Sequence, residues 1–448
     1  MTPRRVIGLM SGTSLDGVDA AVIETDGERV QGFGPALTLP YPPALRAALR
    51  ALLDRAPHLR TDDPALRAAE AELTARHAEA VAALGVTADL IGFHGQTILH
   101  DPKARRTWQI GDAAALARAT GLAVVFDFRS RDVAAGGEGA PLVPVFHAAL
   151  AAGLPRPLAI LNIGGVANVT WIGAGDTLLA CDTGPGNGPL DDWLTRHTGA
   201  PFDADGALAQ AGQADEAVLA RLLDHPYFRR AAPKSLDRLA FAEALATSGL
   251  DRLRPADGAA TLTAFLAASV AATPLPAPPR RWLVTGGGRR NPAIMAALRR
   301  HLAAPVDAVE TLGWDGDALE AQCFAFLAAR HLAGLPISFP ETTGAPRPLP
   351  GGGGSRALEQ HPFGGNRTGD VGDDGARQRA ASTASARLTS NPPGSSMARW
   401  EILPSLAISA KRWLRTPRPR ATRSSSRPIA LVNAPEPSAS IRILSPAP

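Results

Sequence analysis

The sequence has few residues that could crosslink it or anchor it in a lipid bilayer. Its 448 residues include only two cysteines, Cys181 and Cys323, too far apart in sequence to suggest a disulfide framework. It has no run of eighteen apolar residues, so no membrane-spanning helix is expected. The apolar run near the amino terminus is broken at Ser11 and Gly12 and is too short for a secretory signal. These absences predict a protein of the reducing cytoplasm, without a membrane partner.

The basic excess, a formal net charge of +4, belongs to the carboxyl-terminal part of the chain. Residues 351–448 hold 14 of the 46 lysines and arginines but only 6 of the 42 acidic residues. Residues 1–350 therefore carry a small net negative charge, and no nucleic-acid partner is expected. The last part begins with GGGGS and mixes Arg, Ser, Pro and Ala without periodicity, which is typical of disordered chain. We therefore expect residues 351–448 to form a disordered tail.

Two stretches about 150 residues apart have the same layout: an apolar strand, a turn of small residues and a second apolar strand. They are VIGLMSGTSLDGVDAAVIE at 6–24 and LAILNIGGVANVTWI at 158–172. Each predicts a β-hairpin, and their likeness indicates two similar halves. Glycines in such turns let backbone N–H groups approach an anion. The alternative is a pair of ordinary turns, which also favour Gly, Ser and Asp.

A third glycine run, TGGGRRNP at 285–292, follows an expected strand and precedes an expected helix. It has neither the G-K-[ST] ending of a P-loop nor the G-x-G-x-x-G spacing of a dinucleotide site. Two hairpin loops together with a strand–GGG–helix loop resemble the actin-like ATPase and sugar-kinase superfamily. That resemblance implies an α/β, two-lobed, ribonuclease H-like fold with an ATP cleft between the lobes.

Eight sequence words, in order over about residues 5–350, resemble the anhydro-N-acetylmuramic acid kinase family. They are GLMSGTSLDGVD (8–19), GFHGQT (92–97), QIGD (109–112), FDFRSRDVAAGGEGAPLVP (126–144), NIGGVANVT (162–170), DTGPGN (182–187), TGGGRRNP (285–292) and LEAQCFAFLA (319–328). The resemblance implies an enzyme that uses ATP and Mg²⁺ in cell-wall sugar recycling. Such an enzyme opens the 1,6-anhydro ring of anhydro-N-acetylmuramic acid with water and phosphorylates the 6-oxygen. The family usually has Gln where this chain has Glu138.

The resemblance makes Asp182 the catalytic base. It comes after a strand expected at Thr177–Cys181, where an aspartate considered alone is more often an Asx-turn residue. It also implies substrate contacts from His94, placed after a strand expected at Leu90–Phe93, and from Glu320 and Gly184. For His94 the alternative is a structural histidine, and for Glu320 a solvated side chain. Lys234, in the partly matching segment PKSLDR, is a further candidate.

The resemblance places the ATP contacts in the two hairpin turns and the GGG run. The expected residues are Ser11, Gly12, Thr13, Ser14, Asp16, Gly17, Asp19, Asn162, Gly164, Gly165, Asn168, Gly286, Gly287 and Gly288. Of these, Asp16 and Asp19 are the candidates for holding Mg²⁺ through water, and the sequence does not choose between them.

The expected first lobe comprises residues 1–130 and 320–348, and the expected second lobe comprises residues 131–319. Three alternatives to the anhydro-sugar kinase stay open, one of which is a decayed, inactive copy, suggested by the unusual tail. An ordinary hexose kinase of the same superfamily would need no base to activate water. A non-enzymatic actin-like ATPase, such as a chaperone or filament protein, would use the same two hairpins. The sequence is also compatible with a homodimer.

Overall fold

The computed structural model describes residues 2–175, 177–236 and 240–355. The predicted disordered tail lies outside the described residues from position 356 onward. In the described ranges, no helix combines the length and apolar character that crossing a membrane would need.

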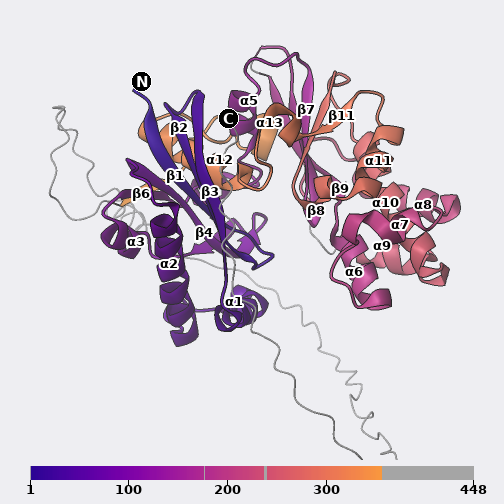
Figure 1. Cartoon of the computed structure of the whole chain (residues 1–448), viewed down its shortest axis with the longest axis horizontal. Helices are drawn as coiled ribbons and strands as arrows, with labels where there is room; N and C mark the ends of the chain where they lie inside the picture. Colours follow the sequence, from indigo (N-terminus) through magenta and orange to yellow (C-terminus); the bar gives the residue numbers. More distant parts are fainter. Residues whose placement is uncertain (1, 176, 237–239, 356–448) are drawn as a thin grey trace, which may run out of the picture. The chain divides into compact units, whose positions relative to one another are not determined.

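The first sheet contains seven strands and carries the first predicted hairpin (Figure 1). Its order is β12-β6-β4-β1-β2-β3, with β5 paired to β4. Strand β1 is antiparallel to β2 and parallel to β4. The strands are β1 (Arg4–Ser11), β2 (Gly17–Thr25), β3 (Val30–Pro40), β4 (Leu90–Asp101), β5 (Arg106–Ile110), β6 (Ala123–Phe126) and β12 (Gly353–Ser355).

The second sheet has five strands in the order β11-β10-β7-β8-β9 and carries the second hairpin. They are β7 (Leu158–Ile163), β8 (Val166–Ile172), β9 (Leu178–Pro185), β10 (Trp282–Thr285) and β11 (Val306–Ala308). Each sheet has three antiparallel strands (β3-β2-β1 or β9-β8-β7) followed by two parallel ones (β4-β6 or β10-β11). The predicted repeat of two similar halves is therefore confirmed.

The helices come mainly from segments between these strands, and several begin at a capping side chain. Asp63 accepts from the N–H groups of Ala65 and Leu66, and Asp112 accepts from the N–H of Ala115. The helices are α1 (Pro43–Arg55), α2 (Pro64–Leu84), α3 (Ala113–Thr120), α4 (Ser130–Ala135), α5 (Pro144–Leu150), α6 (Gly188–Thr198), α7 (Ala207–Gln210), α8 (Glu216–Leu223), α9 (Ala242–Thr247), α10 (Pro255–Ala271), α11 (Pro292–His301), α12 (Leu319–Leu332) and α13 (Pro340–Thr343).

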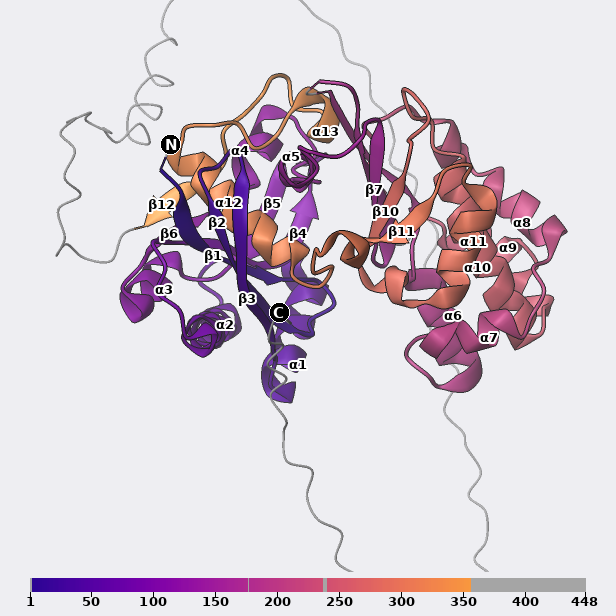
Figure 2. The same ribbon diagram turned by 45° about the horizontal axis from the view of Figure 1, so that its top comes forward.

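Helix α12 packs against β1, β2 and β4 of the first sheet (Figure 2). The approach is close because glycines lie beneath the helix. A Cβ added at Gly8 would lie 1.7 Å from the backbone oxygen of Ala321, and one at Gly92 would lie 2.0 Å from that of Phe324. This glycine contact fixes the start of α12, where Glu320 lies, beside the first hairpin.

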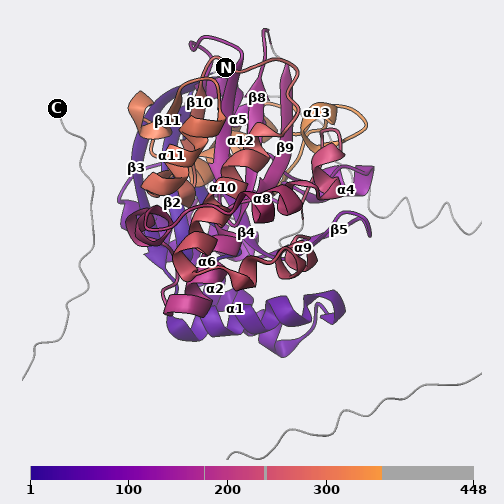
Figure 3. The same cartoon turned by 90° about the vertical axis from the view of Figure 1, so that its right-hand side faces the viewer.

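In the second half, α10 packs against β9 and against α6, α7, α8 and α11 (Figure 3). A separate apolar core contains side chains from both sheets, including Val6 and Leu90 from the first and Leu158 and Leu283 from the second, together with α5 and α12. The predicted lobe boundaries stay a prediction, although the packing of α12 on the first sheet agrees with assigning residues after 319 to the first lobe.

Three local predictions were wrong. Strand β4 continues to Asp101 instead of ending at Phe93, because its neighbour changes from β1 to β5 at Gln96. Strand β9 continues to Pro185, because β8 pairs with it that far, so Asp182 lies inside a strand. The tail was expected to begin at 351, but residues 353–355 form β12 and pair with β6.

Candidate active site

Loops from both sheets line one cavity of about 690 Å³, here called the glycine cavity. The first hairpin, the second hairpin, the GGG run and the start of α12 all contribute. The predicted residues that line it are Gly12, Ser14, Asp16, Gly17, Asp19, Asn162, Gly164, Gly165, Gly286, Gly287 and Glu320. The structure therefore brings together most of the residues that the sequence assigned to the nucleotide, from Gly12 to Gly287, and it adds Glu320, which was expected to contact the sugar.

The glycines of this cavity differ in what surrounds them. A Cβ added at Gly165 would meet nothing within 4 Å, and one at Gly12 would meet only the Ser14 hydroxyl oxygen, at 3.6 Å. The backbone at these two glycines is therefore accessible from the cavity, as the backbone of a phosphate-binding loop must be. Gly286 is confined instead: its φ is +75°, and a Cβ there would lie 2.4 Å from Oδ1 of Asn162. The GGG run therefore packs directly on the second hairpin.

Among the acidic residues that line the glycine cavity are Asp16, Asp19, Asp317 and Glu320. Thr38 donates its hydroxyl proton to Oδ1 of Asp19 at 2.6 Å. Burial raises the pKa of Asp19 to about 6, and the nearby charges of Glu320 and Asp317 add to the rise. The pKa of Glu320 is also raised, because the protein around its carboxyl group displaces water. The residue as a whole is still exposed toward the cavity. Negatively charged oxygens that line one space suit a hard divalent cation, which prefers oxygen ligands.

Asp16 and Asp19 differ in their surroundings. The Asp16 side chain is 69% exposed, and one of its oxygens lies 3.5 Å from a guanidinium nitrogen of Arg46. Asp19 is partly buried and has Thr38 as its hydrogen-bond donor. Among the described residues, no group of three or more His, Cys, Asp or Glu side chains is close enough to hold a metal by itself. A cation here would therefore need oxygen ligands from water or from a bound phosphate.

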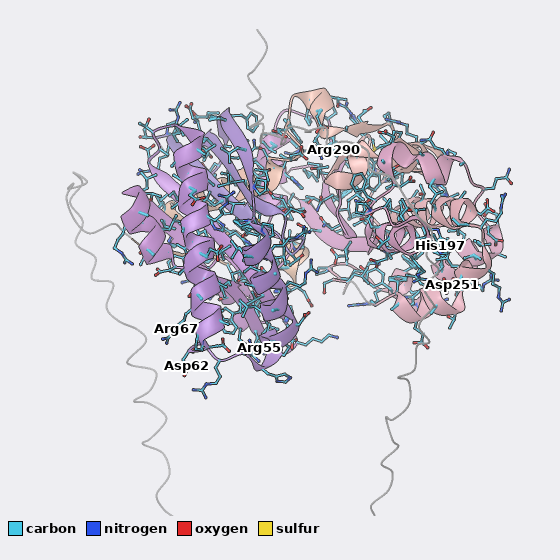
Figure 4. All side chains as sticks on the ribbon, turned by 60° about the horizontal axis from the view of Figure 1, so that its bottom comes forward. Arg55, Asp62, Arg67, His197, Asp251 and Arg290 are labelled. Atoms are coloured by element: carbon cyan, nitrogen blue, oxygen red, sulfur yellow. The ribbon has the colours of Figure 1, made fainter. Side chains whose placement is uncertain are left out.

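Arginines tie the GGG run to the start of α12. Arg289 is buried, and its guanidinium donates to Glu310 at 2.6 Å and to Asp317 at 3.0 Å. Arg290, labelled in Figure 4, also pairs with Asp317 and lines the glycine cavity. Asp317 thus belongs to both the cavity wall and the ion-pair network.

Asp182 lies in a second cavity, of about 860 Å³, here called the Asp182 cavity. The segment 234–236 holds it by backbone contacts: its N–H donates to the oxygen of Lys234 at 2.9 Å, and its Oδ2 accepts from the N–H of Leu236 at 2.7 Å. Burial raises the pKa of Asp182 to about 7, with a further rise from the charge of Glu138, while the Leu236 bond and Lys234 lower it. Asp182 can therefore accept a proton near neutral pH.

Residues that line the two cavities lie on neighbouring strands of the second sheet. Asn162 on β7 lies opposite Asn168 on β8, and Asn168 lies opposite Asp182 on β9. Neighbouring strands are about 4.8 Å apart, so the backbone of Asp182 lies about 10 Å from that of Asn162. Asp182 is therefore on the same part of the sheet as the second hairpin loop.

Several predicted residues lie outside the glycine cavity. Ser11 is buried, and its hydroxyl donates to the backbone oxygen of Gly95 at 3.1 Å. Thr13 does not line the cavity, and Gly288 is buried against Ile163. Asn168 was expected among the ATP contacts, but it lines the Asp182 cavity instead. The turn sequence could not show this, because successive side chains of a strand point to opposite faces.

The predicted substrate residues are separated. His94 is buried beside a small cavity of about 210 Å³, where it accepts from Nε of Arg129 at 3.0 Å. Burial, with the charge of Arg129, keeps its pKa well below the usual value, so the ring is neutral. Gly184 lines neither main cavity and packs against Ser269 of α10. Lys234 does line the Asp182 cavity, but its ammonium donates to the backbone oxygen of Tyr227 at 3.2 Å.

Sequence reasoning missed several residues that line the cavities, among them Asp317, Asn187 and Glu138. Asp317 lies in the glycine cavity two residues before α12, where an acidic residue after Gly316 could have drawn notice. Asn187, inside the quoted word DTGPGN, has a buried Oδ1 with no hydrogen-bond partner and also lines that cavity. Glu138 was noted only as a departure from the family, yet it lines the Asp182 cavity.

The repeated strand order of the two sheets, with glycine loops from each on one cavity, defines an α/β protein of the actin-like ATPase and sugar-kinase class. Within that class, the chain belongs to the anhydro-N-acetylmuramic acid kinase family, whose model matches residues 4–354.

Relatives of that name match most of the chain. The protein from Acidiphilium cryptum is 69% identical over 348 residues, covering 77% of this chain and 96% of the relative. The one from Rhodospirillum rubrum is 59% identical and covers 77% and 92%. Among solved structures, a ROK family glucokinase from Streptomyces griseus in complex with glucose and AMPPNP is a remote likeness. It has 15% identity and a TM-score of 0.33, and it covers 73% of this chain and 99% of that chain.

Proposed function

We propose that this protein is a cytoplasmic kinase that opens the 1,6-anhydro ring of anhydro-N-acetylmuramic acid and phosphorylates the freed 6-oxygen. The products are N-acetylmuramic acid 6-phosphate and ADP, in recycling of cell-wall sugar. Family membership supports this activity. The observation that carries it is the placement of Asp182, a partly buried carboxylate two strands from the glycine cavity.

The glycine cavity is the proposed ATP site. The bare backbone of Gly12 and Gly165 would face the terminal phosphates from the two sheets, since neither position has a side chain in the way. Gly286 and Gly287 would lie against the adenosine. Phosphoryl transfer depends chiefly on such positioning and on neutralising the charge of the phosphate oxygens.

Asp19 is the proposed residue for orienting Mg²⁺, in preference to Asp16. Asp19 is partly buried and is held by Thr38, whereas Asp16 is exposed and paired with Arg46. Bound Mg²⁺ would supply positive charge to the phosphates.

In the proposed reaction, Asp182 accepts a proton from the water that attacks the anomeric carbon. The bond between that carbon and the 6-oxygen breaks, and the 6-oxygen bonds to the γ-phosphorus as ADP leaves. One well-placed base of this kind contributes about 10²–10⁴-fold to the rate.

The activity can be tested by incubating the purified chain with ATP, Mg²⁺ and 1,6-anhydro-N-acetylmuramic acid. The molecular mass of the product is then measured by mass spectrometry. The proposal expects a product heavier than the sugar by one phosphoryl group and one water. A product heavier by the phosphoryl group alone would indicate an ordinary hexose kinase. ATP hydrolysis without a sugar product would favour the non-enzymatic ATPase.

Turnover should fall as the pH drops below about 7. The base must be ionised, and the raised pKa of Asp182, about 7, means that its carboxyl group is increasingly protonated below that pH. The measurement is kcat/KM between pH 5.5 and 9 under saturating ATP. A profile that stays flat down to pH 5.5 would contradict the role of Asp182 as the base.

Asp19→Asn should raise the Mg²⁺ concentration that gives half-maximal activity by about 10–100-fold, the usual range for losing an oriented partner of a metal site. Asn keeps an oxygen for Thr38, so the local structure should persist. The measurement is a Mg²⁺ titration at fixed ATP, with the exposed Asp16→Asn as the matched comparison. An equal or larger effect in Asp16→Asn would reverse the assignment.

A further inference from the structure

Glu138 lies on the loop between α4 and α5, and this loop is held in place on several sides. The N–H of Gly139 donates to Oδ1 of the buried Asp132 at 2.6 Å, and the hydroxyl of Thr343 donates to Oδ2 of Asp132 at 2.7 Å. The N–H of Glu138 itself donates to the backbone oxygen of Thr343 at 2.7 Å. The backbone of Glu138 is thus fixed, and its carboxylate lines the Asp182 cavity.

The Glu138 carboxylate is joined to Asp182 through two consecutive residues. The Ser235 hydroxyl donates to Oε2 of Glu138 at 2.9 Å, and the N–H of Leu236 donates to Oδ2 of Asp182 at 2.7 Å. The backbone oxygen of Lys234, the residue just before them, accepts a hydrogen bond from the N–H of Asp182. A short segment therefore contacts one carboxylate with a side chain and the other with its backbone.

Other charged and titratable groups also face this space. The Asp182 cavity is lined by His100, Asp101, Lys103, Glu138, Asp182, His225, Tyr227, Arg230 and Lys234. Apart from burial and the Leu236 hydrogen bond, the interactions that shift the pKa of Asp182 are with Glu138, which raises it, and Lys234, which lowers it. The buried thiol of Cys181 is its neighbour in the chain.

We propose that Glu138 is a positioning residue for Asp182, acting on it through the negative charge that the Ser235 hydrogen bond holds in the same cavity. A neighbouring negative charge disfavours ionisation of a carboxyl group. The carboxylate therefore has a higher affinity for a proton. Glu138 therefore makes Asp182 a stronger base for water than a glutamine at position 138 would. This inference rests on the proposed function, since it assigns a proton-accepting role to Asp182.

Glu138→Gln tests the charge with little change of shape. The Gln side-chain oxygen can still accept from Ser235, so the segment 234–236 should stay in place. We expect the acid limb of the kcat/KM profile to move about 0.5–1 pH unit lower, with a lower plateau, because Asp182 becomes a weaker base. Ser235→Ala, which keeps the charge, should move the limb by less than half as much. Glu341→Gln, on α13 and outside this cavity, is the matched control and should leave it in place.

A carbon-13 NMR titration of the Asp182 carboxyl group gives a second measurement that needs no substrate. Its midpoint should be lower in Glu138→Gln than in the unmodified chain. An unchanged midpoint, or an equal shift in Ser235→Ala, would overturn the inference. Failure of the unmodified chain to phosphorylate the sugar would instead refute the proposed function, while the titration would still report on Glu138.

Discussion

Asp182→Asn is expected to lower turnover of the anhydro sugar by at least 10²-fold, and as far as 10⁴-fold if no other group accepts the proton from water. An amide has no comparable basicity, yet it keeps an oxygen for the N–H of Leu236. Because burial disfavours the charged carboxylate, the variant should unfold at a temperature no lower than the unmodified chain. ATP affinity should change little, since Asp182 does not line the glycine cavity.

The measurements are kcat by a coupled ADP assay, ATP affinity by calorimetry and the thermal midpoint. Asp251→Asn is the matched control, because Asp251 is an exposed carboxylate, labelled in Figure 4, whose loss removes only a surface ion pair with Arg196. Near-normal turnover in Asp182→Asn would refute the catalytic assignment. Loss of ATP binding together with turnover would point to a structural role instead.

Gly8→Ala is expected to destabilise the protein by about 3 kcal/mol, the upper part of the range for overpacked cores. Its Cβ would lie 1.7 Å from the backbone oxygen of Ala321, and a helix backbone cannot yield as a flexible side chain can. Helix α12 would have to move away from β1, and Glu320 at its start would move with it. ATP affinity should therefore fall along with stability.

Urea denaturation provides the test, with Gly153→Ala as the matched control. An added Cβ at Gly153 would meet no atom within 4 Å, so that variant should be as stable as the unmodified chain or slightly more stable. A Gly8→Ala protein within about 0.5 kcal/mol of the unmodified chain would show that α12 is not held as tightly as the contact implies.

The parts of the fold that local sequence predicted are those that local chemistry determines. The two hairpins depend on apolar strands and on turns rich in small residues, so both were found at 6–24 and 158–172. Asp112 caps α3 through an equally local contact, to the N–H of Ala115. The extent of β4 and β9 was missed, because a strand lasts as long as a neighbour pairs with it, and those neighbours lie elsewhere in the sequence.

The candidate site shows the same limit. Ser11 is the last residue of β1, next to the predicted turn, but its hydroxyl donates to the backbone oxygen of Gly95, a contact 84 positions away that no local pattern reveals. The surroundings of Asp182 come from Glu138, Tyr227 and the segment 234–236, which share no motif. The family resemblance identified Asp182 itself, whereas its proton affinity depends on long-range burial and charge.

In the proposed mechanism, the opposed positions of Asn162, Asn168 and Asp182 also limit the size of substrate that can react. Because three hydrogen-bonded strands cannot slide past one another without breaking their pairing, the sheet fixes the spacing between the backbone of Asp182 and that of Asn162. A compact bicyclic sugar, whose reacting carbon and acceptor oxygen share a bond, suits such a constant interval. An open-chain analogue that carries the same two atoms several bonds apart should be a poor acceptor even when it binds.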